Sequence, residues 1–209
     1  MEDKDWDLIH QVHAYGTYSC TKAAWPIMRD QKYGRIINTT SASGLYGNFG
    51  QSNYSAMKMS VVGLAYTLAQ EGRKRGILVN CIAPGAGSRM TATIMPDEMV
   101  QAYKPDYVSP VVAWLCHKDC TETGQVYEAG GGWVAKVKWQ RSKGATFDVR
   151  DDFGPEKIRD AMDDLRDFSA PSPNFDPNAS KEEKSETGQG FKNLIRLGVY
   201  ERPGKKSRL

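Results

Sequence analysis

Tyr54 and Lys58 stand four residues apart in a segment with helical periodicity, so both side chains share one helix face. A tyrosine hydroxyl titrates near pH ~10 and is a poor base at neutral pH. A neighbouring ammonium favours the phenolate and lowers the pKa of the phenol, which suits general acid–base catalysis. Many helices carry Tyr-x-x-x-Lys by chance, so the pair alone is a weak signal and favours a solvated surface pair.

Ser41 adds context to this pair. The β-branched run 35–40 predicts a short strand, and Ser41 follows it directly. Open α/β sheets bind ligands at the carboxyl ends of their strands. A serine hydroxyl there is suited to hydrogen-bond the same substrate oxygen on which Tyr54 acts. A second predicted strand, 77–82, is expected to stop at Pro84-Gly85 at the same edge.

The remaining elements indicate the fold class. Apolar residues recur at spacings of three and four over 3–28 and 52–75, which predicts two long helices. A third strand is expected at 125–128. Helices alternating with strands imply parallel strands joined by crossover helices, which is an α/β layer fold.

The chain divides into three predicted regions. Residues 1–147 carry the alternating elements, and 148–168 predict a short helix with one apolar face. Residues 169–209 are expected to form a disordered linker and a basic tail, because they are rich in Ser, Pro, Asn, Glu and Lys.

Composition excludes several classes of protein. The chain has 209 residues, 40% of them hydrophobic, and a net charge of +3. No run approaches the ~18 apolar residues of a membrane span. Six basic residues and one acidic residue lie from Lys192 onward, so the positive charge belongs to the tail and no nucleic-acid-binding face is expected. Cys116-His117 and Cys120 resemble half a zinc site, but no second pair follows, so we expect no metal.

Longer strings carry a more specific resemblance. Ser41, Tyr54 and Lys58 are spaced as in the short-chain dehydrogenases/reductases, which the chain resembles from about Asp5 to Trp139. Within that family, three strings resemble the (3R)-hydroxyacyl-CoA dehydrogenase domain of peroxisomal multifunctional enzyme type two. They are YGNFGQSNY (46–54), APGAGSRMT (83–91) and WVAKVKW (133–139).

The resemblance implies a role for each matching residue. Tyr54 would be the acid/base on the 3-hydroxyl of an acyl-CoA substrate, and Ser41 would orient that hydroxyl. Lys58 would lower the pKa of Tyr54 and hold the nicotinamide ribose. Ala86, Gly87, Ser88 and Arg89 would lie along the cofactor. The implied reaction is oxidation of (3R)-3-hydroxyacyl-CoA to 3-ketoacyl-CoA by NAD, with NADP not excluded.

Two departures from the family pattern are informative. His13 stands where many members of the family have an asparagine. An ordinary histidine on the helix surface would explain its presence equally well, so we assign it no role. The family's first strand and Thr-Gly-x-x-x-Gly-x-Gly turn, which bind the cofactor pyrophosphate, have no counterpart here. The fold implied is therefore the C-terminal part of a Rossmann-like, doubly wound parallel sheet, and we expect the chain alone to bind the cofactor poorly.

These departures leave three hypotheses about function. The chain is an oxidoreductase of fatty-acid β-oxidation, an inactive truncated homologue that associates with full-length enzyme, or an incomplete gene model. The resemblance also implies a homodimer through helices 3–28 and 52–75. The C-terminal Ser207-Arg208-Leu209 is a close variant of the peroxisomal Ser-Lys-Leu signal, which predicts binding to the import receptor and localisation in the peroxisome.

Overall fold

The computed structural model describes residues 1–87, 96–169, 193–194 and 196–199, which form two compact units, Met1–Val137 and Lys138–Leu209. Ser88, Arg89 and Ser207-Arg208-Leu209 lie outside the described residues, as does most of the predicted tail. The predicted region boundaries at 147 and 168 stay predictions.

The first unit is built on one four-stranded sheet in the order β1-β2-β3-β4. The strands are β1 (Gly34–Thr39), β2 (Ile77–Gly85), β3 (Val126–Gly130) and β4 (Trp133–Val137). The first three run parallel, and β4 pairs antiparallel with β3. The predicted α/β class, with a largely parallel Rossmann-like sheet, is confirmed.

The antiparallel strand β4 was not predicted. Gly130 pairs with Trp133, so only Gly131 and Gly132 form the turn, with φ values of 57° and 82°. Two consecutive positive φ values define a type I′ hairpin turn, which matches the twist of the flanking strands. The predicted end of β2 at Pro84 is also wrong, because β2 continues through Gly85 beside β3.

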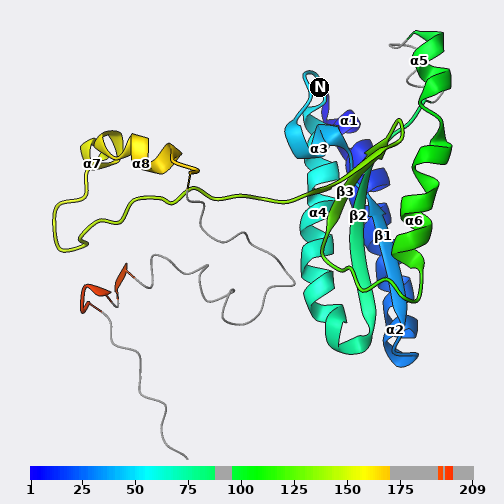
Figure 1. Cartoon of the computed structure of the whole chain (residues 1–209), viewed down its shortest axis with the longest axis horizontal. Helices are drawn as coiled ribbons and strands as arrows, with labels where there is room; N and C mark the ends of the chain where they lie inside the picture. Colours follow the sequence, from blue (N-terminus) through cyan, green and yellow to red (C-terminus); the bar gives the residue numbers. More distant parts are fainter. Residues whose placement is uncertain (88–95, 170–192, 195, 200–209) are drawn as a thin grey trace, which may run out of the picture. The chain divides into compact units, whose positions relative to one another are not determined.

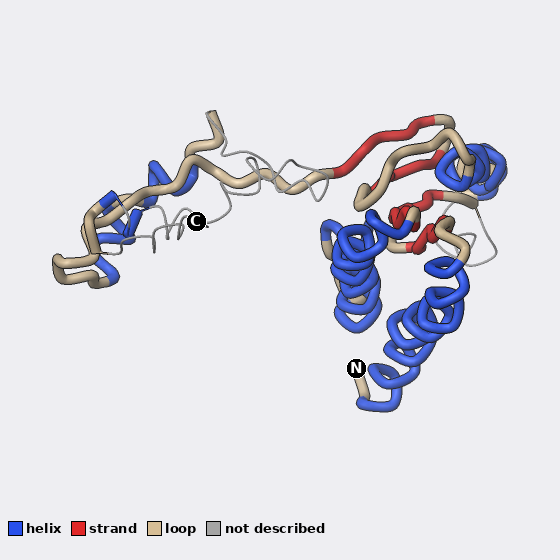
Figure 2. Tube along the Cα trace, turned by 90° about the horizontal axis from the view of Figure 1, so that it is seen from below, coloured by secondary structure: helices blue, strands red, loops and turns tan. Residues whose placement is uncertain are grey.

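Helices cover both faces of the sheet. The long N-terminal helix comprises α1 (Asp3–Ile9), a π-helical turn η1 (His10–Tyr15) and α2 (Gly16–Asp30). Together with α4 (Ser52–Gly72) it covers one face, whereas α6 (Ser109–Cys116) lies on the other (Figures 1 and 2). Shorter elements are α3 (Ala42–Tyr46), η2 (Arg73–Arg75), α5 (Asp97–Ala102) and η4 (Pro105–Tyr107).

The core lies between α4 and the sheet. Its fully or nearly fully buried members are Val61, Val62, Ala65, Ala69, Ile77, Val79, Cys81 and Val126. Burying each large aliphatic side chain stabilises the fold by about 1.5–3 kcal/mol. These contacts fix the position of α4 on β2, and therefore also fix the first turns of α4, where Tyr54 and Lys58 lie.

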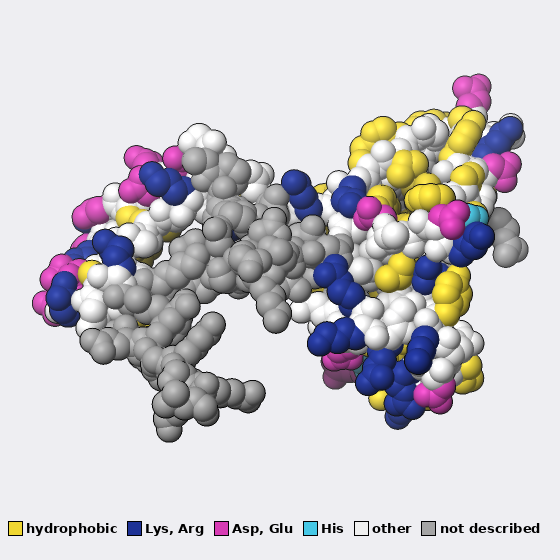
Figure 3. Space-filling view, turned by 60° about the horizontal axis from the view of Figure 1, so that its bottom comes forward, with side chains coloured by type: hydrophobic (Ala, Val, Ile, Leu, Met, Phe, Trp, Pro, Cys, Tyr) yellow, Lys and Arg dark blue, Asp and Glu magenta, His cyan; other side chains and the backbone are white. Residues whose placement is uncertain are grey.

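The surface of the first unit and the helices of the second unit complete the description. Lys and Arg side chains gather where α2 and α4 end, a region that includes the η2 residues Arg73–Arg75 (Figure 3). The second unit contains the short helices α7 (Pro155–Asp160) and α8 (Met162–Arg166). In the described part of the chain, no helix is long and apolar enough to cross a membrane.

Candidate active site

Ser41 lies where β1 passes into α3. It is the N-cap of α3, and its hydroxyl oxygen accepts a hydrogen bond from the Ser43 N–H at 3.2 Å. Three residues on, Gly44 packs so closely on α4 that a Cβ there would be 2.9 Å from the Lys58 Cβ. Because α3 rests on this part of α4, Ser41 is held beside the helix that carries Tyr54 and Lys58.

Tyr54 and Lys58 lie together near the start of α4. The Lys58 Nζ is 5.6 Å from the centroid of the Tyr54 ring, and the tyrosine is half-buried. This distance lies within the range in which an ammonium interacts favourably with an aromatic ring. The Lys58 ammonium and the Tyr54 ring are therefore close enough to interact electrostatically.

Lys58 is held unusually firmly for a lysine. Only 8% of the residue is exposed, and its Nζ donates a hydrogen bond to the Thr39 carbonyl oxygen at 3.0 Å. The Lys58 carbonyl oxygen accepts a hydrogen bond from the buried Thr40 hydroxyl at 2.6 Å. Burial lowers the pKa of the Lys58 ammonium. The end of β1 thus positions the charge that faces Tyr54.

The segment after β2 is also tightly packed. The Gly87 N–H donates to the Tyr103 carbonyl oxygen at 2.6 Å, and a Cβ on Gly87 would overlap the Val100 carbonyl oxygen. Upstream in β2, the fully buried Asn80 side chain donates to the Glu122 carbonyl oxygen and accepts from the Gln125 N–H. Ala86 and Gly87 thus follow a rigid strand end.

His13 joins the pair of predicted residues, although sequence reasoning gave it no role. Its ring centroid is 5.1 Å from that of Tyr54, with an interplanar angle of 85°. Burial, and then the positive charge of Lys58, lower the pKa of His13. In the sequence, His13 was notable only for its position in the helix before β1, and that position does not reveal what the imidazole contacts.

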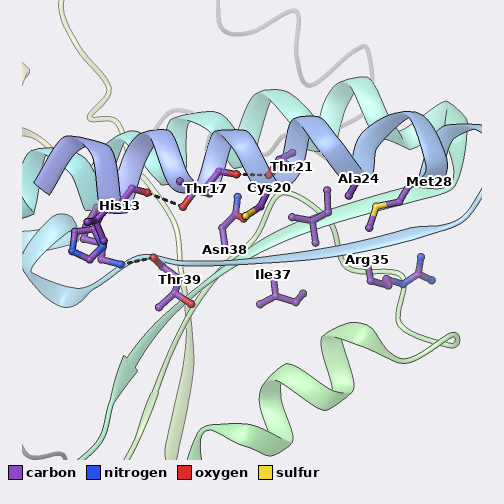
Figure 4. Close-up of a pocket in the computed structure, with 14 residues that line it drawn as sticks. His13, Thr17, Cys20, Thr21, Ala24, Met28, Arg35, Ile37, Asn38 and Thr39 are labelled. Carbon is purple, nitrogen blue, oxygen red and sulfur yellow. Dashed lines mark hydrogen bonds between the residues drawn. The ribbon is translucent and has the colours of Figure 1, made fainter. Parts of the chain in front are cut away.

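A groove of about 620 Å³ runs between the N-terminal helix and β1. In Figure 4, His13, Thr17 and Cys20 on the helix face Asn38 and Thr39 on the strand. Its lining includes polar groups along its length: His13, Thr17, Thr21, Arg35, Asn38, Thr39 and Lys58. The His13 and Lys58 side chains therefore border solvent-accessible space.

The described residues fit a nicotinamide cofactor at one end only. Tyr54 and Lys58 supply the phenol and the ammonium expected beside the nicotinamide ribose. The glycines at and just after the end of β2 are instead used in packing, since Gly85, its last residue, lies against Gly130 and Gly87 against Val100. Within the same described ranges, no group of three or more His, Cys, Asp or Glu residues could hold a metal ion.

The lowered pKa of Lys58 predicts a pH dependence of stability. The unfolded chain binds this proton more tightly than the folded protein, so the Lys58 contribution to the unfolding free energy rises with pH between the lowered pKa and 10.5. We expect the unfolding free energy of the wild type, minus that of Lys58→Met, to become more positive across this window. Urea unfolding at a series of pH values measures both, and a constant difference throughout would contradict the prediction.

Comparison with known proteins identifies relatives over most of the chain. The sequence profile of the short chain dehydrogenase family matches residues 1–99. Mouse peroxisomal multifunctional enzyme type 2 is 49% identical over 91% of this chain and 25% of its own length. Peroxisomal multifunctional enzyme A of Dictyostelium discoideum is 54% identical over 82% of this chain and 38% of its own length.

Solved structures agree with these sequence relatives. Full-length peroxisomal multifunctional enzyme type 2 from Drosophila melanogaster matches with a TM-score of 0.80 and 38% identity, over 94% of this chain and 35% of that one. A short chain dehydrogenase from Mycobacterium avium gives a TM-score of 0.65 and 33% identity, over 78% and 57%. The chain thus covers less than two thirds of the length of each of these relatives. Residues 1–99 match the short chain dehydrogenase family, and most of the chain is similar to part of the peroxisomal multifunctional enzymes.

Proposed function

We propose that the chain carries the catalytic residues of an oxidoreductase that converts (3R)-3-hydroxyacyl-CoA to 3-ketoacyl-CoA with NAD. The observation that carries this proposal is the buried Lys58 ammonium, bonded to the Thr39 carbonyl and 5.6 Å from the Tyr54 ring. Relatives named peroxisomal multifunctional enzyme and peroxisomal hydratase-dehydrogenase-epimerase support a dehydrogenase reaction, and the substrate is the one that the sequence resemblance implies.

The roles follow from the chemistry of each group. Tyr54 accepts the proton of the substrate 3-hydroxyl, and the Lys58 ammonium stabilises the phenolate that makes this transfer possible. Ser41 donates a hydrogen bond to the same substrate oxygen. A bound NAD would supply the acceptor for the hydride that leaves C3 of the substrate. Ala86, Gly87, Ser88 and Arg89 would lie along the cofactor, and NADP is compatible with the same residues.

The chain alone is expected to bind the cofactor weakly. The pyrophosphate of a dinucleotide is normally held by a glycine-rich turn that follows a strand and opens a helix. No such turn occurs in the ranges that the structure describes. We therefore expect calorimetric titration of the 209-residue chain with NAD to give no micromolar binding.

Turnover tests the assigned chemistry directly. At millimolar NAD, we expect slow formation of NADH from a (3R)-3-hydroxyacyl-CoA, and Tyr54→Phe should lower the rate by about 10²–10⁴-fold, the usual contribution of a general acid/base. Tyr66→Phe, on the same helix, is the matched control and should leave the rate unchanged. Turnover that survives Tyr54→Phe would contradict the assignment. Absence of any turnover would favour the second candidate function.

The second candidate is an inactive homologue that dimerises with a full-length enzyme through α1–α2 and α4. A groove of about 320 Å³ between α2 and α4 supports it, lined by Tyr18, Trp25, Leu64 and Leu68 among others. The N-terminal helix exposes further apolar residues, which are Trp6, Leu8, Tyr15 and Ile27. We propose that a second copy of these helices, from the same chain or from a longer relative, covers this surface.

A charged substitution in the groove between α2 and α4 tests whether the chain dimerises through this surface. Leu68→Glu should convert a dimer to a monomer in sedimentation equilibrium, because it places a carboxylate in an apolar contact. Thr67→Glu, at the exposed neighbouring position, is the matched control and should leave the oligomeric state unchanged. A dimer that persists in Leu68→Glu would place the interface elsewhere.

Localisation in the peroxisome is proposed from two observations. The relatives carry peroxisomal names, and the chain ends in Ser207-Arg208-Leu209. A chain tagged at its N-terminus should appear in peroxisomal puncta, and Leu209→Asp should make it diffuse because the receptor reads the terminal tripeptide. Lys205→Ala, just before the tripeptide, should retain the puncta. Unchanged puncta in Leu209→Asp would reject receptor binding through this signal.

A further inference from the structure

His13 lies in the π-helical turn that interrupts the N-terminal helix. The turn spans His10–Tyr15, and the Gly16 N–H donates to the Gln11 carbonyl oxygen, five residues back. The Thr17 hydroxyl donates to the His13 carbonyl oxygen at 2.7 Å. Such turns recur at functional sites because they change which direction a helical side chain faces. Here the side chain in the widened turn is the one that contacts Tyr54.

The contact has a defined geometry. The imidazole and phenol ring centroids are 5.1 Å apart and the rings are nearly perpendicular, at 85°. Edge-to-face pairs at about 4.5–7 Å are the favoured aromatic arrangement. The same phenol ring lies 5.6 Å from the Lys58 Nζ. Tyr54 therefore contacts two basic side chains, which are held by different elements.

Only one of these two groups is expected to be charged at neutral pH. Burial and the Lys58 charge both lower the pKa of His13 from 6.5. From α4, the ionisable groups that face His13 are Lys58 and Tyr54, and β1 presents the Thr39 carbonyl. His10 lies on the same π-helical turn, with Tyr15 at its end. An imidazolium at position 13 would repel the Lys58 ammonium, whose own position is fixed by Thr39.

We propose that His13 is a positioning residue for Tyr54: in its neutral form it holds the phenol ring beside Lys58, and its protonation weakens that arrangement. The inference rests on the proposed function for the catalytic meaning of Tyr54, whereas the coupling between the two rings does not. It predicts that the environment of Tyr54 changes as His13 titrates.

The coupling is measured by NMR on the full chain with ¹³C-labelled tyrosine and histidine. Tyr54→Phe assigns the Tyr54 signal among the 10 tyrosines. Between pH ~5 and ~8, we expect this signal to shift with an inflection below 6.5 that coincides with the titration of His13. His13→Phe keeps an aromatic edge but cannot be protonated, so the inflection should vanish. His10→Phe, in the same turn, is the matched control and should retain it.

The outcomes separate this inference from the proposed function. A Tyr54 signal without an inflection at the His13 pKa in the wild type overturns the inference, and so does an inflection that survives His13→Phe. The wild-type titration alone decides if His13→Phe does not fold. Where the chain turns over substrate, His13→Phe should also flatten the acid limb of the kcat profile. An inflection without any turnover leaves the coupling in place and rejects the catalytic assignment.

Discussion

The arrangement of the site depends on one buried ammonium. A lysine side chain removed from water needs a hydrogen-bond acceptor, because an unpaired buried charge is strongly unfavourable. Lys58 finds this acceptor in the Thr39 carbonyl at the end of β1, and its own carbonyl is bonded by the next residue, Thr40. The start of α4 is thereby tied to the carboxyl end of a strand. The contact with Thr39 sets the position of the Lys58 ammonium, and burial lowers its pKa.

Because α4 is tied to β1 in this way, the packing of the core also fixes the positions of the site residues. Val61, Val62 and Ala65 bury α4 against β2, and the close approach of Gly44 to Lys58 places α3 on the same helix. Ser41 is therefore held in place by β1, which precedes it, and by α3, of which it is the N-cap. Each candidate side chain lies next to a segment that is held by many apolar contacts, which can keep the geometry of a site in place without ligand.

Sequence reasoning predicted the parts of this arrangement that depend on local periodicity. The helical spacing of Tyr54 and Lys58 and the β-branched run before Ser41 were sufficient to predict a helix and a strand. The strand β4 was missed because its antiparallel pairing depends on positive φ at Gly131 and Gly132, and a run of glycines is equally typical of an irregular turn. The end of β2 was set too early, since proline usually interrupts sheets, whereas Pro84 is exposed on a strand that continues.

The contact between His13 and Tyr54 shows why the rest of the site was not predictable. The two residues are 41 positions apart, and an unbroken α-helix gives no reason to select His13 over His10. The π-helical turn makes that selection by altering the helical register within a single turn. This turn packs against α4, the helix that carries Tyr54. A sequence pattern can therefore pick out Tyr54 and Lys58 as a candidate acid/base and its ammonium, but the imidazole beside the phenol emerges only from the tertiary structure.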